Sequence, residues 1–312
     1  MRFLVVGAGA MGGYFGGRLL EAGRDVSFLV RPGRAGQLAA NGLGITSPAG
    51  NALLPNPPTV LADQLRDTFD VVVLSCKAYD LDTAIESVAP AVGPRTAVLP
   101  LLNGMRHLDT LDARFGADRV LGGACFISAR LDDRGHVAHL GDPHRLTFGE
   151  RAGGRSPRVD AIAAEMQRAK FEAAPTDQVM LEMWEKWTFL ATLAGITCLT
   201  RAAIGDVVAA GGADFTVALV HECRAIAAAA GFAPRPESMD LGLKRLTHPR
   251  SAVTASMLTD LERGGRTEAD HILGDLLRRR GEVAGDRSLL RLAYVAVQAA
   301  QARAAREVSG SA

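Results

Sequence analysis

Glycines are the first residues of this chain whose spacing suggests chemistry. Seven of them stand between Arg2 and Gly23, although each glycine inside a helix costs roughly 0.5–1 kcal/mol relative to alanine. Their pattern GxGxxG follows a short apolar run and opens a helical pattern, as a dinucleotide-binding turn requires. There the first glycine permits a tight turn, the second admits a pyrophosphate close to the backbone, and the third lets helix and strand pack. A flexible leader, or a tight turn without a ligand, is the alternative. The predicted cofactor-binding turn consists of Gly7, Ala8, Gly9, Ala10, Met11 and Gly12.

A cation ends the next apolar run. Arg31 stands there, and Arg34 follows it in the sequence RPGR. Proteins that bind NAD usually present a carboxylate at this place to the ribose 2′-hydroxyl, and a carboxylate would repel a 2′-phosphate. A guanidinium can instead bind that phosphate through two parallel hydrogen bonds. Arg31 therefore favours NADP (NADPH) as the cofactor, and the alternative is that both arginines are solvated loop residues.

The elements that must position these residues alternate in the first half of the chain. Short β-branched runs alternate with amphipathic segments, which predicts an α/β domain with a Rossmann-like, doubly wound parallel sheet. The segments 130–142 and 145–150 are expected to add antiparallel strands at the edge of this sheet. We expect strands at 2–6, 25–31, 70–76, 97–103 and 120–126, and helices at 10–22, 81–92 and 107–116.

In the second half of the chain, the sequence pattern after Pro175 predicts helices and no strands. We place the domain boundary in the segment 171–177, so that residues 1–174 form the nucleotide-binding domain and residues 175–312 an all-α domain. The expected helices lie at 178–199, 215–230, 268–280 and 288–306, with the segments 231–240 and 245–251 as separators.

Composition narrows the classes of partner. Lys and Arg total 35 against 34 Asp and Glu, so no global field favours nucleic acid or an acidic membrane surface. No apolar stretch reaches the roughly 18 residues of a membrane span, and the start lacks the features of a secretion signal. Four scattered cysteines without a CxxC pair indicate reduced thiols and a cytoplasmic protein.

Three histidines lie close together at positions 136, 139 and 144. Their gaps across an expected hairpin set no common face toward a metal ion, and no helical carboxylate–histidine motif accompanies them. We expect surface or edge-strand histidines here and no bound metal.

Further motifs are spaced along nearly the whole chain. After GAGAMG and Arg31 come CKAYD around Lys77, LLNGM around Asn103, EMWEKW around Lys186, and ASMLTDLERGGRTEADHILG over 255–274. Together they resemble the ketopantoate reductase family, the NADPH-dependent 2-dehydropantoate 2-reductases. The resemblance implies a Rossmann-like first domain, an all-α second domain for substrate and catalysis, and an active site in the cleft between them.

The resemblance gives Lys186 the role of general acid. Reduction of a ketone by hydride leaves an alkoxide that needs a proton and a positive neighbour. A lysine between Trp184 and Trp187 of an apolar helix can supply both. The alternative is a surface lysine that pairs with Glu182, four residues earlier on the same helix face.

The resemblance also implies roles for four other residues. It places Lys77 beside the cofactor, Asn103 at the nicotinamide ribose and the substrate, Glu268 at the cofactor ribose and the nascent hydroxyl, and Ser256 at the substrate carboxylate. The structural alternatives are a loop lysine, an Asn-Gly turn, an acid near a helix start and a capping serine.

Three positions depart from the family's pattern. Where the family has asparagines that hold the substrate, this chain has Leu190, Ala194 and Ile204. A site without those amides discriminates against the original ligand. We therefore expect an NADP-dependent oxidoreductase for a ketopantoate-like 2-oxo acid, or for a different, less polar carbonyl substrate. A non-catalytic, NADPH-binding regulatory protein is the alternative from another class, and the sequence is compatible with a monomer or a homodimer.

Overall fold

The computed structural model describes residues 1–281 and 287–309, and it divides into two units. Unit 1 consists of Met1–Leu102 and His107–Met180. Unit 2 consists of Asn103–Arg106 and the chain from Leu181 onward. A four-residue segment of the first half is therefore part of the second unit.

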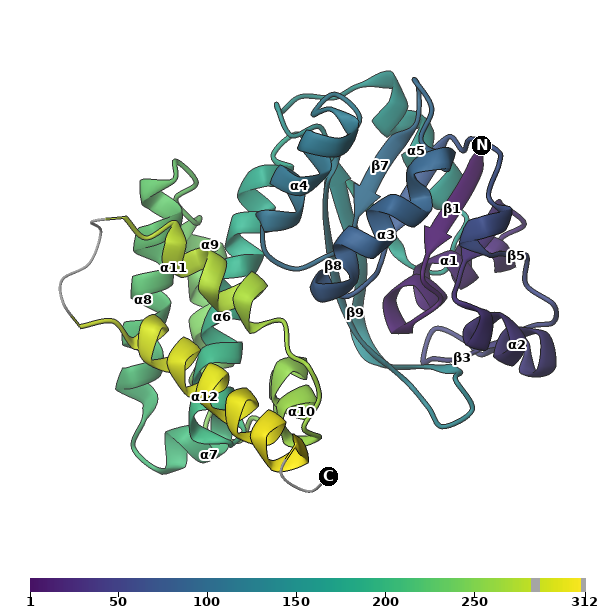
Figure 1. The fold of residues 1–312 in the computed structure, drawn as a ribbon. Coiled ribbons are helices and arrows are strands. Elements are labelled where there is room, and N and C mark those ends of the chain that lie inside the picture. Colours follow the sequence, from purple (N-terminus) through teal and green to yellow (C-terminus); the bar gives the residue numbers. More distant parts are fainter. Residues whose placement is uncertain (282–286, 310–312) are drawn as a thin grey trace. The chain divides into compact units, whose positions relative to one another are not determined.

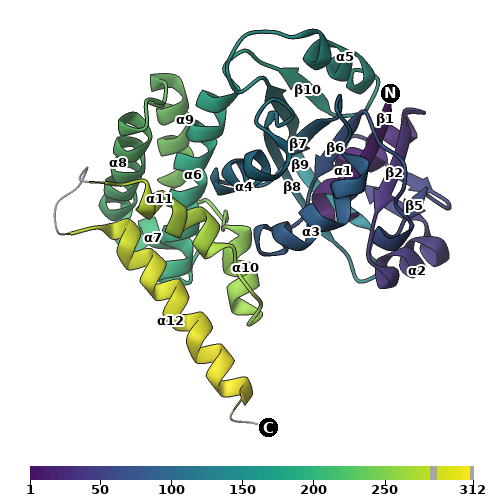
Figure 2. The ribbon, with the colours of Figure 1, turned by 45° about the horizontal axis from the view of Figure 1, so that its top comes forward.

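Unit 1 contains a parallel sheet in the order β5-β2-β1-β6-β7. The strand order progresses in opposite directions from β1, which is the doubly wound arrangement that the sequence predicts (Figures 1 and 2). Strands β6 and β7 are buried along their whole length, as apolar strands covered on both faces must be. The strands are β1 (Arg2–Val6), β2 (Asp25–Leu29), β5 (Thr59–Val60), β6 (Val71–Leu74) and β7 (Ala97–Pro100). The helices that connect and follow them are α1 (Ala10–Glu21), α2 (Pro32–Asn41), α3 (Leu81–Val88) and α4 (Arg106–Phe115).

A second, mixed sheet corrects the expectation of strands added to the edge of the first. Its order is β10-β9-β3-β4, and β8 pairs antiparallel with β9. Only Val120 continues the parallel sheet, through a bridge to Val98, and from Gly122 the chain pairs with β9 instead. Strand β10 lies within the segment 171–177, in which the sequence predicts the domain boundary. The members of this sheet are β3 (Leu43–Thr46), β4 (Ala52–Leu54), β8 (Gly122–Leu131), β9 (Val137–Gly149) and β10 (Glu172–Pro175). Helix α5 (Pro157–Met166) connects β9 to β10.

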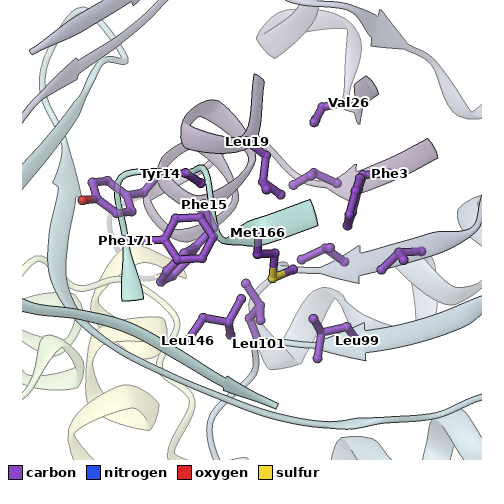
Figure 3. Close-up of a cluster of buried hydrophobic side chains, with 14 of the residues drawn as sticks. Phe3, Tyr14, Phe15, Leu19, Val26, Leu99, Leu101, Leu146, Met166 and Phe171 are labelled. Atoms are coloured by element: carbon purple, nitrogen blue, oxygen red, sulfur yellow. The ribbon is translucent and has the colours of Figure 1, made fainter. Parts of the chain in front are cut away.

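Helix α1 contacts both sheets, because glycines leave two of its faces without side chains. A Cβ at Gly16 would lie 2.7 Å from the Phe28 ring of the parallel sheet, and one at Gly17 would lie 2.8 Å from Ile45 of the mixed sheet. The core of the unit surrounds this helix, with Phe15 and Leu19 facing side chains of both sheets and Met166 of α5 (Figure 3). The glycine-rich sequence thus brings the mixed sheet close to the nucleotide-binding type of sheet.

Every element that the structure describes in unit 2 is helical. Its central helix, α6 (Val179–Thr200), is buried on almost every side, and the other helices surround it (Figure 1). The long last helix packs against α8 and reaches past its neighbours (Figure 2). The expected separators 231–240 and 245–251 are wrong where a helix crosses them. The helices are α6 (Val179–Thr200), α7 (Ile204–Ala209), α8 (Ala213–Ala229), α9 (Pro236–Leu246), α10 (Ser256–Glu262), a π-helical turn (Asp270–Gly274), α11 (Asp275–Arg278) and α12 (Leu289–Ser309).

None of the helices in the described ranges has the length and apolarity needed to cross a lipid bilayer. The 22-residue α6 comes nearest in length, but Glu185 and Lys186 interrupt its apolar sequence.

Candidate functional site

The predicted cofactor turn lies at the carboxyl edge of the parallel sheet. Val6 at the end of β1 is in register with Leu29 of β2 and Leu74 of β6, so the three strands end together. Gly7 follows with φ +90°, a conformation that favours glycine, and its N–H donates to the Leu29 carbonyl at 2.9 Å. Ligands of doubly wound sheets bind at this edge and at such a reversal of strand order.

Gly12 and Gly9 are glycines for different reasons. A Cβ at Gly12 would lie 2.1 Å from the Gly7 carbonyl oxygen, so close packing of α1 on the turn excludes any side chain there. A Cβ at Gly9 would meet no heavy atom of the described chain within 4 Å, and its φ of −76° suits any residue. Protein packing therefore leaves room at Gly9, which fits a phosphate that must approach the backbone.

The remaining residues of the turn complete an anion site. Ala10 and Met11 begin α1 with Gly12 and Gly13, so the first turn offers backbone N–H groups and no acidic side chain. Such a helix start attracts anions, and these residues fit a pyrophosphate. Ala8 is buried, and its carbonyl accepts a hydrogen bond from Arg34.

Ser75 supports the turn and was missed from the sequence. Its hydroxyl lies 2.8 Å from the Val6 carbonyl oxygen and 3.0 Å from that of Gly7, to which it donates. The signal available in the sequence was one polar residue at the end of the apolar run VVVLS.

The two arginines after β2 differ in their surroundings. Arg34 is half-buried and donates to the carbonyls of Ala8 and Gly135 and to Gln37. Burial lowers the pKa of its guanidinium, which stays charged at neutral pH. Arg31 is 73% exposed and pairs with Asp80 at 2.9 Å. Arg31 is therefore the arginine whose side chain can turn toward a ligand.

Lys77 lies at the same edge of the sheet as Arg31. It directly precedes the turn that carries Asp80, two residues beyond the Ser75 that holds the glycine turn. Strands β2 and β6 flank β1 on opposite sides. The structure thus brings Arg31 and Lys77 to the two sides of the Gly7–Gly12 turn.

Lys186 lies on the one partly exposed stripe of α6. Between residues 183 and 198, only Lys186, Phe189 and Leu190 are partly exposed, and all others are buried. The neighbouring Trp184 and Trp187 are 3% and 1% exposed and lie with ring centres 4.9 Å apart. The two buried indoles anchor this turn of the helix, so the side chain of Lys186 projects from the partly exposed stripe.

Hydrogen bonds tie the helix of Lys186 to the segment of Glu268. Trp187 Nε1 donates to the Ile272 carbonyl at 2.9 Å, and the Ile272 N–H donates to the Glu268 carbonyl at 2.9 Å. The side chain of Glu268 is partly exposed. Asn103 is held to the same segment, because the buried imidazole of His271 is bonded to its backbone.

Ser256 and the three departing positions also belong to unit 2. Ser256 is exposed at the start of α10, and the preceding Ala255 donates to Thr197 Oγ1 of α6 at 3.4 Å. Ile204 begins α7, is buried, and donates to the Val253 carbonyl at 3.1 Å. Leu190 and Ala194 follow Lys186 at steps of four along α6, with Leu190 partly exposed and Ala194 buried.

One of the three histidines, His139, differs from the expectation of surface or edge-strand positions, whereas His136 and His144 are partly exposed. His139 is 4% exposed and stacks on His144, and its ring bonds Ser47 Oγ and the Gly141 carbonyl, each at 2.8 Å. The His139 ring lies beside that of Tyr14 in α1, with ring centres 4.8 Å apart. Within residues 1–281 and 287–309, no three His, Cys, Asp or Glu side chains gather as metal ligands do.

A glycine-rich turn at the carboxyl edge of a parallel sheet, joined to a helical unit, is typical of dinucleotide-dependent oxidoreductases. The family model described as ketopantoate reductase PanE/ApbA matches residues 3–153, and the model of its C-terminal part matches residues 178–301. The chain belongs to the ketopantoate reductase family, as its motifs predicted.

Individual relatives agree over almost the full length. The chain is 36% identical over 299 residues to the uncharacterized oxidoreductase YkpB of Bacillus subtilis (strain 168), covering 96% of this chain and 98% of that protein. It is 30% identical over 295 residues to the 2-dehydropantoate 2-reductase of Mesorhizobium japonicum, covering 88% and 89%. The chain is thus an oxidoreductase of this family.

Solved structures show the same fold. The 2-dehydropantoate 2-reductase of Geobacter metallireducens GS-15 has a TM-score of 0.88 at 26% identity, covering 96% of this chain and 100% of that one. A D-mandelate dehydrogenase with NADH and anilino(oxo)acetate has a TM-score of 0.85 at 21% identity, covering 97% and 99%. This second similarity concerns the fold alone.

Proposed function

We propose that the chain is an NADPH-dependent reductase that converts a 2-oxo acid of the ketopantoate type to the 2-hydroxy acid. Residues 1–174 would hold the coenzyme, and residues 175–312 would carry the substrate and catalytic groups. The observation that supports this best is the assembly of unit 2, where Asn103 and the helix of Lys186 are both bonded to the segment that follows Glu268.

The coenzyme, when bound, supplies a hydride to the carbonyl carbon. Lys186 holds a positive charge beside the carbonyl oxygen and gives it a proton, which neutralises the alkoxide. The Asn103 amide both donates and accepts, so it orients the nicotinamide ribose and the substrate. Glu268 accepts from the ribose and the new hydroxyl, and Ser256 donates to the substrate carboxylate.

The role of Lys186 is tested by following NADPH oxidation. Replacement Lys186→Ala removes the proton donor, so kcat should fall by about 10²-fold or more while NADPH affinity stays within about twofold. Lys244→Ala, at an exposed lysine near the end of α9, is the matched control and should change neither quantity. An unchanged kcat in Lys186→Ala would contradict the assignment.

The preference for NADPH is tested at Arg31. Replacement Arg31→Ala removes a charged hydrogen-bond donor from the 2′-phosphate, so the KM for NADPH should rise by about tenfold or more. The KM for NADH, which lacks that phosphate, should stay within about twofold and serves as the control. Equal effects on both coenzymes would remove Arg31 from this role.

The apolar positions favour a second candidate within the same reaction. Leu190 lies one helical turn beyond Lys186 on its partly exposed stripe, and neither Ala194 nor Ile204 offers a side-chain hydrogen bond. A 2-oxo acid with an aliphatic or aromatic substituent would fit against these apolar side chains better than one with a hydroxyl group. A substrate panel decides: faster turnover of ketopantoate supports the first candidate, and faster turnover of apolar 2-oxo acids supports the second.

The same panel covers the non-catalytic alternative. Tight NADPH binding without oxidation by any carbonyl compound would favour a regulatory protein. A place in pantothenate biosynthesis depends on turnover of ketopantoate, and a cytoplasmic location stays a prediction from the sequence.

A further inference from the structure

The segment Asn103–Arg106 is packed on unit 2, although strand β7 before it and most of helix α4 after it belong to unit 1. Gly104 and Met105 are buried, and Asn103 is partly exposed. Something in unit 2 must therefore hold this short segment in place.

His271 in the π-helical turn contacts this segment. Its ring is 7% exposed and forms a hydrogen bond with the backbone of Asn103. The next residue packs on it so closely that a Cβ at Gly104 would lie 3.0 Å from the His271 carbonyl oxygen and 3.1 Å from Cδ2 of its ring. Gly104 also has φ +78°, a conformation that other residues rarely adopt, so the backbone and the close packing both favour glycine there.

The π-helical turn gives His271 its place between the other groups. The N–H groups of His271 and Ile272 both donate to the Glu268 carbonyl, at 3.0 and 2.9 Å. The Ile272 carbonyl accepts from Trp187, the neighbour of Lys186. Single π-helical turns are rare in proteins, but those that occur often lie at functional sites.

We propose that His271 is a positioning residue that holds the backbone of Asn103, so that its amide is presented from the same unit as Lys186 and Glu268. The proposal rests on the proposed function for the role of that amide. His271 acts through Asn103 and does not itself touch the substrate.

The charge state of the ring supports this role. Burial lowers the pKa of His271, Arg106 lowers it further, and Glu268, Asp275 and the bond to Asn103 oppose that shift. The ring is therefore neutral at pH 7, and its remaining N–H can donate to the backbone carbonyl of Asn103.

A double-mutant cycle tests the coupling. His271→Phe keeps a ring without the donor, and we expect kcat/KM for the 2-oxo acid to fall by about tenfold. In the background of Asn103→Ala, which has already lost the amide, the same change should have an effect of less than about twofold. His271→Gln, which restores an N–H donor, should recover most of the loss. Additive effects of the two substitutions would overturn the proposal.

A second readout does not need turnover. The His271→Phe variant should show faster backbone hydrogen exchange in the peptide that covers 103–106, measured by mass spectrometry, with unchanged exchange at the Gly7–Gly12 turn. Unchanged exchange over 103–106 would overturn the proposal. If the wild-type protein reduces no carbonyl compound while His271→Phe still frees this segment, the proposed function fails and the positioning contact stands.

Discussion

Gly9 and Gly12 stand in one motif, but at the scale of the single residue their surroundings differ. The nearest atom to a Cβ at Gly12 is a backbone oxygen of the same turn, which cannot move without breaking the turn. At Gly9 the position of a Cβ is open among the described residues. Protein packing thus explains Gly12, and the open space at Gly9 is the feature that a ligand would explain.

Substitution by alanine should separate the two causes. Gly12→Ala overpacks the turn and should lower the free energy of unfolding by about 1–3 kcal/mol, measured by urea denaturation. Gly9→Ala should leave that free energy within about 0.5 kcal/mol and weaken NADPH binding by about tenfold or more, because the methyl group occupies the room of the pyrophosphate. Equal NADPH affinity of Gly9→Ala and wild type would contradict a coenzyme at this turn.

The chemistry-bearing residues could be found from the sequence in part. Gly7–Gly12 and Arg31 follow apolar strands, and parallel strands end at one edge, so their proximity follows from local pattern. The supporting contacts of Ser75 and His271 could not be predicted, since each joins segments far apart in the chain. The functional roles of Lys186, Glu268 and Ser256 stay predictions.

At the scale of the element, helix α1 determines the environment of the mixed sheet. His139 of β9 lies beside Tyr14 of α1, with ring centres 4.8 Å apart, and close to Arg18 of the same helix. Because its ring accepts from Ser47 and donates to Gly141, the neutral form satisfies both nitrogen atoms. Protonation would convert the accepting nitrogen to a donor.

Acid should therefore destabilise the protein through His139. Burial, with His144 and Arg18, lowers its pKa in the folded state against the opposing effects of the Gly141 carbonyl and Asp142, so below about pH 6.5 the unfolded chain binds more protons. This contribution is complete above that pH and is lost as the pH falls toward the folded-state pKa. Urea denaturation at about pH 7.5 and pH 5 should show a smaller decrease in His139→Gln than in wild type. An equal decrease would exclude His139 as a source.

Strands and helices of unit 1 differ in how far the sequence predicted them. Strands β1, β6 and β7 are continuous apolar runs with local connections, and their predicted positions are confirmed within a few residues. Strands β4 and β10 have only three and four residues, too few for a clear alternating pattern. Strand β4 pairs with the preceding strand β3, whereas β10 pairs with β9 across the intervening helix α5. Helix α9 begins at Pro236, within the segment 231–240 that the sequence predicts to separate two helices, and proline suits the first turn of a helix.

At the scale of the whole molecule, the groups proposed for the substrate are distributed unevenly. Asn103, Lys186, Ser256 and Glu268 belong to unit 2, although Asn103 and Glu268 are also proposed to contact the coenzyme ribose. The glycine turn, Arg31 and Lys77, which are proposed for the coenzyme alone, belong to unit 1. The substrate pocket can therefore change by substitution within the helices while the coenzyme turn stays the same. The apolar residues at positions 190, 194 and 204 are changes of this kind.

The tetrapeptide between β7 and α4 also limits how the protein can be divided. The polypeptide enters the helical unit at Asn103, leaves it after Arg106, and enters it again at Leu181. A truncation that ends at Met180 would separate the segment Asn103–Arg106 from the rest of unit 2. The helical fragment would then lack the segment whose backbone bonds to His271. The two halves that the family models delimit are therefore not two separable modules, and a gene encoding either half alone would specify an incomplete fold.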